Sequence, residues 1–239
     1  MHENLDKIKS LESPTRIIKN FLNSDEIEKF LKLYLKLPIT VNNLKQKVIK
    51  KRWISDTSSK ELEQILRDRI KLEIGDFTMD NINEKDGTEC LGLFQESFNP
   101  IGLHVDGGFN LKDIIYKQTL LPLSNHGETI VFKNRYYGPS TSFINTETDL
   151  KENSSENFKK GKNIRSSDHL KIYSNKPFDK NNHEKYLKHE DINNLKGLEV
   201  ELVYKWNLGD LFIFDRTHLH CSSSNIDGKK IGLATFTKK

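Results

Sequence analysis

The sequence predicts a mainly β protein with flanking α-helices, an antiparallel β-sandwich or jelly roll with helices packed outside it. Two observations lead to this fold class. Segments with helical periodicity come first along the chain, and many short strand-like segments follow them. That order is typical of a helix-flanked antiparallel fold rather than of alternating α/β units. A length of 239 residues suits one large domain with a sizeable core, or two small ones.

Two helices are predicted in the N-terminal third. In residues 20–38, apolar residues recur at helical spacing, Ser24 is the expected N-cap, and Pro38 ends the helix. Residues 58–74 carry a second apolar stripe, and Gly75 is the expected C-terminal cap. We therefore expect residues 1–85 to form a helical N-terminal support.

The periodicity then changes to that of strands. Six segments are short, rich in β-branched and aromatic residues, and bounded by turn residues. They are residues 90–98, 115–123, 128–132, 199–206, 211–214 and 230–237. We expect a jelly-roll core made of residues 86–146 and 198–239, and one domain over the whole chain 1–239.

A long polar tract, residues 147–197, interrupts these strands. Its first part has almost no apolar residues, and a loop of this length is usually functional or mobile. We predict a partly disordered lid or partner-binding insert. Within it, residues 168–174 are expected to form a short strand and residues 183–198 a helix.

Charge and cysteine content restrict the functional classes. The 38 Lys and Arg residues against 34 Asp and Glu give a net charge of +4, spread along the chain, which is no argument for nucleic-acid binding. Two cysteines cannot form a disulfide framework, so a reducing compartment is expected. No signal-peptide-like or membrane-spanning segment is evident. We expect a cytoplasmic protein that is not associated with membranes.

The stretch "GLHVDGG", residues 102–108, holds the first candidate site residues. His104 and Asp106 are metal-ligand types, and residues two apart on an extended strand face the same side. His218 and His220, near the end of the chain, can supply a third ligand if the jelly roll brings distant strands together. Two histidines and one carboxylate, with open coordination positions, are diagnostic of non-haem Fe(II) oxygenases.

Longer segments carry a resemblance to a known family. The chain has "HVD" at 104–106, a distal His220 and a basic Lys230 ten positions later. It also has "LLPLSNHGETIVF" after the first motif, "GDLFIFDRTHLHCSSSN" around the distal histidine, and "RIIKNFLNSDEIEKFL" before the core. In these features the chain resembles the Fe(II)/2-oxoglutarate-dependent dioxygenase superfamily. A lysine at the last motif position is similar to the prolyl 4-hydroxylase-like branch.

The resemblance implies a double-stranded β-helix, that is, a cupin-like jelly roll, and a role for each motif residue. His104, Asp106 and His220 would bind Fe(II) and form the catalytic centre. Lys230 would hold the far carboxylate of the co-substrate 2-oxoglutarate, with Gln118, Thr129 or a tyrosine as a helper, since lysine is a point charge. O2 would complete the cofactor set. With the Asp106 carboxylate present, the implied reaction is hydroxylation of a C–H bond, with release of succinate and CO2.

Several assignments stay open at this level. His218 competes with His220 for the metal, and the "FD" spacing favours His220. Lys229 competes with Lys230, since strand parity points only one of them inward. The expected substrate-binding residues are Arg135 and Tyr137 of "KNRYYG", which could line the substrate mouth, and His218.

The substrate is also open. A peptidyl residue or a small metabolite is expected, whereas nucleic acid is not favoured. The rival functions are a Zn-dependent hydrolase, or a non-enzymatic jelly-roll binding module, that uses the same His/Asp/His site. The composition, rich in Lys, Asn and Ile, is also similar to that of compact phage oxygenases, which would place the protein in a host cytoplasm. The oligomeric state is not predicted.

Overall fold

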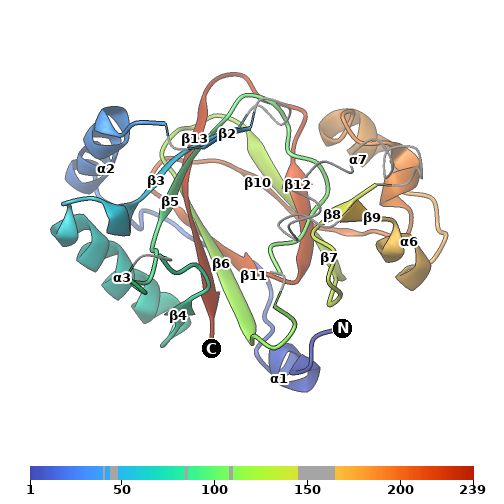
Figure 1. Ribbon diagram of the computed structural model, residues 1–239. Coiled ribbons are helices and arrows are strands. Elements are labelled where there is room, and N and C mark those ends of the chain that lie inside the picture. The colour runs from blue at the N-terminus through green and yellow to red at the C-terminus, as the bar shows by residue number, and fades with distance from the viewer. Residues whose placement is uncertain (40, 44–47, 84–85, 108–109, 145–164) are drawn as a thin grey trace.

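The computed structural model describes residues 1–39, 41–43, 48–83, 86–107, 110–144 and 165–239 (Figure 1). Within these ranges the chain forms two antiparallel sheets and a two-stranded parallel pair. The large sheet has the order β1-β11-β6-β13-β5-β3-β2, with β4 paired to β13, and the small sheet has the order β10-β7-β12. Neighbours in each sheet are mostly distant in sequence, and the predicted double-stranded β-helix is confirmed.

The strand bounds follow. The large sheet contains β1 (Arg16–Ile18), β2 (Val41–Asn43), β3 (Val48–Trp53), β4 (Thr78–Met79), β5 (Leu93–Ser97), β6 (Ile115–Pro122), β11 (Leu211–Asp215) and β13 (Lys230–Lys238). The small sheet contains β7 (Glu128–Arg135), β10 (Val200–Lys205) and β12 (His218–Ser222), and the parallel pair is β8 (Ser142–Phe143) with β9 (Arg165–Ser166). All six predicted strand segments are therefore present, with ends shifted by a few residues.

Helices cover the two outer sides of the molecule. The described helices are α1 (Leu5–Ser10), α2 (Ser24–Lys36), α3 (Lys60–Ile74), α6 (Asp168–Ile172) and α7 (Lys180–Tyr186), with 3-10 turns η1 (Ile54–Asp56) and η2 (Ile192–Leu195). Figure 1 shows α2 and α3 beside the large sheet and α6 and α7 on the opposite side, next to the small sheet. In the described part of the chain, no helix combines the length and the apolar character needed to cross a membrane.

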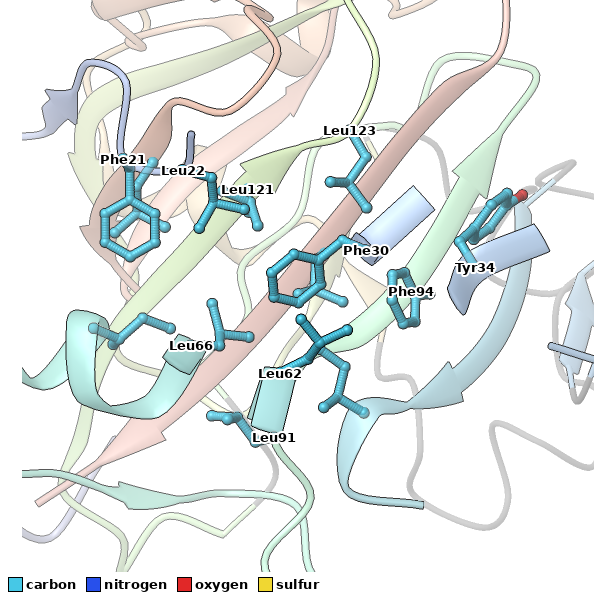
Figure 2. Close-up of a cluster of buried hydrophobic side chains, with 14 of the residues drawn as sticks. Phe21, Leu22, Phe30, Tyr34, Leu62, Leu66, Leu91, Phe94, Leu121 and Leu123 are labelled. Carbon is cyan, nitrogen blue, oxygen red and sulfur yellow. The ribbon is translucent and has the colours of Figure 1, made fainter. Parts of the chain in front are cut away.

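The core beneath α2 and α3 is built from the predicted helix stripes. Phe30 of α2 and Leu62 and Leu66 of α3 point toward Phe94 and Leu121 of the large sheet (Figure 2). All five side chains are buried. Removing this apolar surface from water is the main stabilising contribution to the packing of the two helices.

The N-cap of α2 is Asn23 and not Ser24, as the sequence had suggested. The Asn23 side chain accepts a hydrogen bond from the Glu26 backbone N–H at 3.0 Å, and Glu26 accepts one from the Asn23 N–H at 2.9 Å. This capping box satisfies two end groups at once. Glu26 also pairs with Arg69 of α3 at 2.9 Å, which joins the two helices. The predicted Gly75 cap of α3 is present, with its N–H bonded to the Lys71 carbonyl.

Residues 1–85 are not only helical. They contribute β1, which pairs with β11, and β2 to β4, so the large sheet extends well into the N-terminal region. The sequence of β3, "VIKKRW", contains three consecutive basic residues. Those charges break the apolar alternation from which strands are predicted.

The described part of the insert, residues 165–197, is folded onto the core. Residues 168–174, expected as a strand, contain helix α6 instead, and its buried His169 bonds the Asn194 carbonyl oxygen through Nε2 at 2.8 Å. Phe178, Leu187 and Leu195 are buried in one apolar cluster with residues of the small sheet. The expectation of disorder for residues 147–164 lies outside the described residues.

The capping box yields a stability prediction. Asn23→Ala removes the acceptor for the Glu26 N–H, so the free energy of unfolding should fall by about 1 kcal/mol. Urea denaturation followed by circular dichroism measures this change. Lys32→Ala is the matched control, because it removes only the exposed pair with Glu28 on the same helix and should cost no more than about 0.5 kcal/mol. Equal losses in the two variants would contradict the capping assignment.

Candidate metal centre and its cavity

Three metal-ligand side chains lie together in the described structure. One ligand atom each from His104, Asp106 and His220 falls within 4.8 Å of the other two. His220 Nε2 is 3.2 Å and His104 Nε2 is 4.0 Å from Asp106 Oδ2. The imidazole centroids are 4.1 Å apart. Two nitrogens and one carboxylate oxygen that converge from one side can hold a divalent metal and leave positions open.

Backbone pairing brings the two histidines together. The His104 N–H donates to the His220 carbonyl and the His220 N–H donates to the His104 carbonyl, both at 3.0 Å. His220 lies on β12, whereas His104 belongs to no named strand and forms isolated bridges to His220 and Ser142. Instead of the expected strand, the segment around His104 forms only these two isolated bridges.

Both imidazoles are oriented by carbonyl groups two residues earlier. His104 Nδ1 lies 2.7 Å from the Gly102 carbonyl oxygen, and His220 Nδ1 lies 2.9 Å from that of His218. A carbonyl oxygen only accepts, so each Nδ1 carries the proton in these bonds. Nε2 is then the nitrogen of each ring that faces Asp106, and it is the atom that can bind a metal once it has lost its own proton.

Asp106 is held in its ionised form. Burial alone would raise the pKa of its carboxyl group. The hydrogen bond from His220, and the positive fields of His104, His220 and Arg216, outweigh burial and hold the pKa well below its usual value. Arg216 also donates through Nε to the Asp106 carbonyl at 2.6 Å and through Nη2 to Asp80 at 2.7 Å. This buried arginine fixes the backbone of the ligand segment.

Lys230 points into the same cavity from the start of β13. The residue is 4% exposed, and Nζ donates to the Glu128 carbonyl at 3.0 Å and to Ser222 Oγ at 3.2 Å. Its Nζ also lies 4.4 Å from the Trp206 ring centroid. Among the described residues no carboxylate forms an ion pair with it, and burial lowers its pKa to about 7. Lys229, in contrast, points outward, with 70% of its side chain exposed.

The two expected helper residues, Gln118 and Thr129, line the cavity as well. Gln118 on β6 is buried, and its Oε1 has no hydrogen-bond partner. Thr129 on β7 accepts a hydrogen bond from Trp206 Nε1 at 2.9 Å. Both lie in the cavity that Lys230 also lines.

The cavity has a volume of about 1230 Å³ and lies between the two sheets, with the insert as a further wall. Its lining also includes Arg52 and Trp53 of β3, Asp80, Asn110, and Arg165 of the insert. These residues and Arg216 were not predicted from the sequence. Of these, only Arg216 had a local signal, since it follows "FD" directly in the distal-histidine motif.

The three residues expected to bind substrate lie outside this cavity lining. Arg135 pairs with Asp215 at 2.8 Å, and the Tyr137 hydroxyl donates to Glu12 at 2.6 Å. His218 Nε2 lies 3.2 Å from Glu201 Oε2, and burial, with Arg135 nearby, lowers the His218 pKa to about 4.

The separation of His218 from His220 has a physical reason. The register of β12 against β7 shifts between His218 and His220. This irregularity breaks the alternation that would put both side chains on one face. His218 therefore lies in a polar cluster with Asp215, Glu201 and Arg135, outside the metal cavity.

No family model matches the sequence, and no curated protein matches it. Solved structures do resemble the fold. HygX from Streptomyces hygroscopicus, with nickel and 2-oxoglutarate bound, has a TM-score of 0.52 at 13% identity, over 100% of this chain and 87% of that one. A 2OG-Fe(II) oxygenase family oxidoreductase from Burkholderia pseudomallei has a TM-score of 0.50 at 11% identity, over 98% and 89%.

EctD from S. alaskensis, solved with 2-oxoglutarate and 5-hydroxyectoine, gives a TM-score of 0.50 at 10% identity, over 100% of this chain and 76% of that one. At such identities the likeness concerns the arrangement of the elements. That arrangement agrees with the sheet order described above. The chain has the double-stranded β-helix fold of the 2-oxoglutarate–Fe(II) oxygenases.

Proposed function

We propose that this protein is an Fe(II)- and 2-oxoglutarate-dependent dioxygenase that hydroxylates a C–H bond. The observation that carries the proposal is the buried Lys230, which shares a cavity with the His/Asp/His cluster and has no carboxylate partner in the described structure. A buried ammonium group is costly unless an anion compensates it. A dicarboxylate co-substrate supplies that anion.

The metal-binding residues would be His104, Asp106 and His220. Their donor set, two neutral imidazoles and one carboxylate, fits Fe(II) and leaves room for further ligands. When bound, the iron would supply the oxidising chemistry together with 2-oxoglutarate and O2. The Asp106 carboxylate would take the coordination position that a halide needs in halogenation, which favours hydroxylation.

Lys230 would bind the far carboxylate of 2-oxoglutarate. Ser222 and the Glu128 carbonyl already orient its ammonium group, and the Trp206 ring excludes water from one side. Turning the Gln118 amide over would present its N–H groups, since its oxygen has no protein partner. These residues would give the lysine point charge the directional helpers that it lacks.

The outer part of the cavity would hold the substrate. Its volume of about 1230 Å³ exceeds the upper range of about 1,000 Å³ for single-ligand pockets, so it has room for the co-substrate and a second molecule. We propose a small metabolite or a peptidyl residue as the substrate. A Zn-dependent hydrolase would need no buried ammonium group beside the metal, and Lys230 therefore favours the oxygenase.

The first prediction concerns metal binding. His220→Ala should abolish stoichiometric Co(II) binding by the metal-free protein, because only two ligands remain. His218→Asn is the matched control, since its amide oxygen can replace Nδ1 as the acceptor for the Asp215 N–H. Isothermal titration should give similar Co(II) affinities for this control and the wild type. A loss of binding in the control with retention in His220→Ala would contradict the ligand assignment.

The second prediction tests the function itself. Anaerobic addition of Fe(II) and 2-oxoglutarate should produce the weak visible charge-transfer band of the chelate. In Lys230→Met, which has a neutral side chain of similar length, about 10- to 100-fold more 2-oxoglutarate should be needed, because one charge-assisted contact is lost. Lys229→Met is the control, because that side chain is exposed, and it should titrate like the wild type. Tight Zn(II) binding without any band would instead favour the hydrolase.

The third prediction concerns pH. Burial lowers the pKa of Lys230 to about 7 in the ligand-free protein, so the group is mostly neutral at higher pH. A dicarboxylate binds the charged form, and binding above pH 7 must take up a proton. The apparent Kd for 2-oxoglutarate should therefore rise from pH 7 to 9, by up to about tenfold per unit. Charge-transfer titrations at each pH measure it, and Lys230→Met should lack this dependence. A flat wild-type profile would contradict the assignment.

A further inference from the structure

One peptide group connects the insert to a metal-ligand candidate. The peptide that joins Gly102 and Leu103 uses both of its polar ends. Its carbonyl oxygen accepts from His104 Nδ1 at 2.7 Å, and its N–H donates to Glu190 Oε1 at 2.6 Å. A carboxylate, a peptide and an imidazole therefore form one continuous hydrogen-bonded chain that ends at the metal-facing Nε2.

The Leu103 N–H depends on Glu190 for its partner. Leu103 is 2% exposed, and the segment around it belongs to no named strand that could pair with this N–H. The adjacent His104 bridges to His220 through its own backbone groups, and its bridge to Ser142 uses the Leu103 carbonyl and the Val105 N–H, so neither bridge uses the Leu103 N–H. A buried N–H without a partner costs about 1–3 kcal/mol, so the Glu190 carboxylate takes the place of a neighbouring strand.

Glu190 is itself held rigidly. Its Oε2 accepts from Asn194 Nδ2 at 3.0 Å, and the same amide donates to the Phe143 carbonyl at 3.1 Å. The Phe143 N–H in turn donates to the Leu103 carbonyl at 3.0 Å. This closed ring of hydrogen bonds, together with the buried Leu187 and Leu195 on either side of Glu190 in sequence, fixes the carboxylate against the ligand segment.

Gly102 provides the space for this contact. A Cβ atom at this position would lie 2.8 Å from Glu190 Oε1, which is closer than real Cβ contacts allow. Any side chain at 102 would push the carboxylate away from the Leu103 N–H. The glycine before "LHVD" is therefore a requirement of the insert contact.

We propose that Glu190 is a positioning residue that orients His104 and sets its tautomer through the Gly102–Leu103 peptide. Its negative charge on the N–H end polarises the peptide and makes the carbonyl a better acceptor for the Nδ1 proton. The lone pair of Nε2 is then directed at the metal position, the role that a directly bonded carboxylate has in carboxylate–histidine–metal arrangements. The inference rests on the proposed function in that a metal binds at His104.

The test compares four variants with the wild type. Nitrogen-15 histidine NMR of the metal-free protein reports which His104 nitrogen carries the proton, and Co(II) titration reports affinity and the d–d spectrum. Glu190→Ala removes the contact, Glu190→Gln keeps an oxygen acceptor, and Gly102→Ala displaces the carboxylate from the other side. Asp179→Ala is the control, because it removes an exposed carboxylate from the same insert, where it caps α7 through the Asn182 N–H.

In Glu190→Ala and Gly102→Ala, His104 should shift toward the Nε2–H tautomer. Co(II) affinity should fall about 10- to 100-fold, with an altered d–d spectrum. Glu190→Gln should stay closer to the wild type, and Asp179→Ala should match it in all three measurements. If Glu190→Ala does not fold, the same measurements on Glu190→Gln and Gly102→Ala can still be compared with those on the wild type.

Two results would overturn the inference. In one, Glu190→Ala keeps the Nδ1–H tautomer and a Co(II) affinity within about threefold of the wild type. Loss of a residue that orients a metal ligand should instead lower the affinity about 10- to 100-fold. In the other, Asp179→Ala loses as much affinity as Glu190→Ala, which would mean that folding of the insert is responsible. If the wild type binds no Co(II), the proposed function fails, while the NMR measurement still decides whether Glu190 orients His104.

Discussion

The pair of backbone hydrogen bonds between His104 and His220 is the constraint on which the rest of the site depends. It joins a segment outside the regular strands to β12 of the small sheet. Because each histidine pairs with the other through its main chain, the distance between the two imidazoles is set by the backbone. Asp106 and the Gly102 carbonyl then take their positions relative to that bridge.

Two opposite electrostatic environments lie along one cavity. At the metal end, positive neighbours keep the Asp106 carboxylate ionised in spite of burial. At the other end, burial without a counter-ion destabilises the charged form of Lys230. A dicarboxylate could compensate the charge of Lys230 with one carboxylate and reach the metal position with the other. Under the proposed function, a carboxylate of the co-substrate would supply the counter-charge for the buried Lys230.

Sequence patterns predicted the features that depend on local periodicity or on motif spacing. The helix stripes, the six strand segments and the association of His104, Asp106 and His220 are of this kind. The patterns failed where tertiary contacts decide. The register shift in β12 separates His218 from His220, and residues 168–174 contain helix α6 where a strand was expected. Arg216 and Glu190 act through backbone groups distant in sequence, and no periodicity reports such contacts.

The long sequence separation across the His104–His220 bridge also affects the order of events in folding. More than a hundred residues separate the two histidines, and the insert that carries Glu190 lies between them in the chain. Contacts between residues so far apart in sequence form late in folding, because closing the long loop between them costs conformational entropy. During synthesis, Gly102 and Asp106 are made together with His104, whereas its bridge partner His220 follows only after most of the remaining chain. Under the proposed function, a ribosome-bound chain that lacks β12 would therefore hold only two of the three candidate ligands, His104 and Asp106.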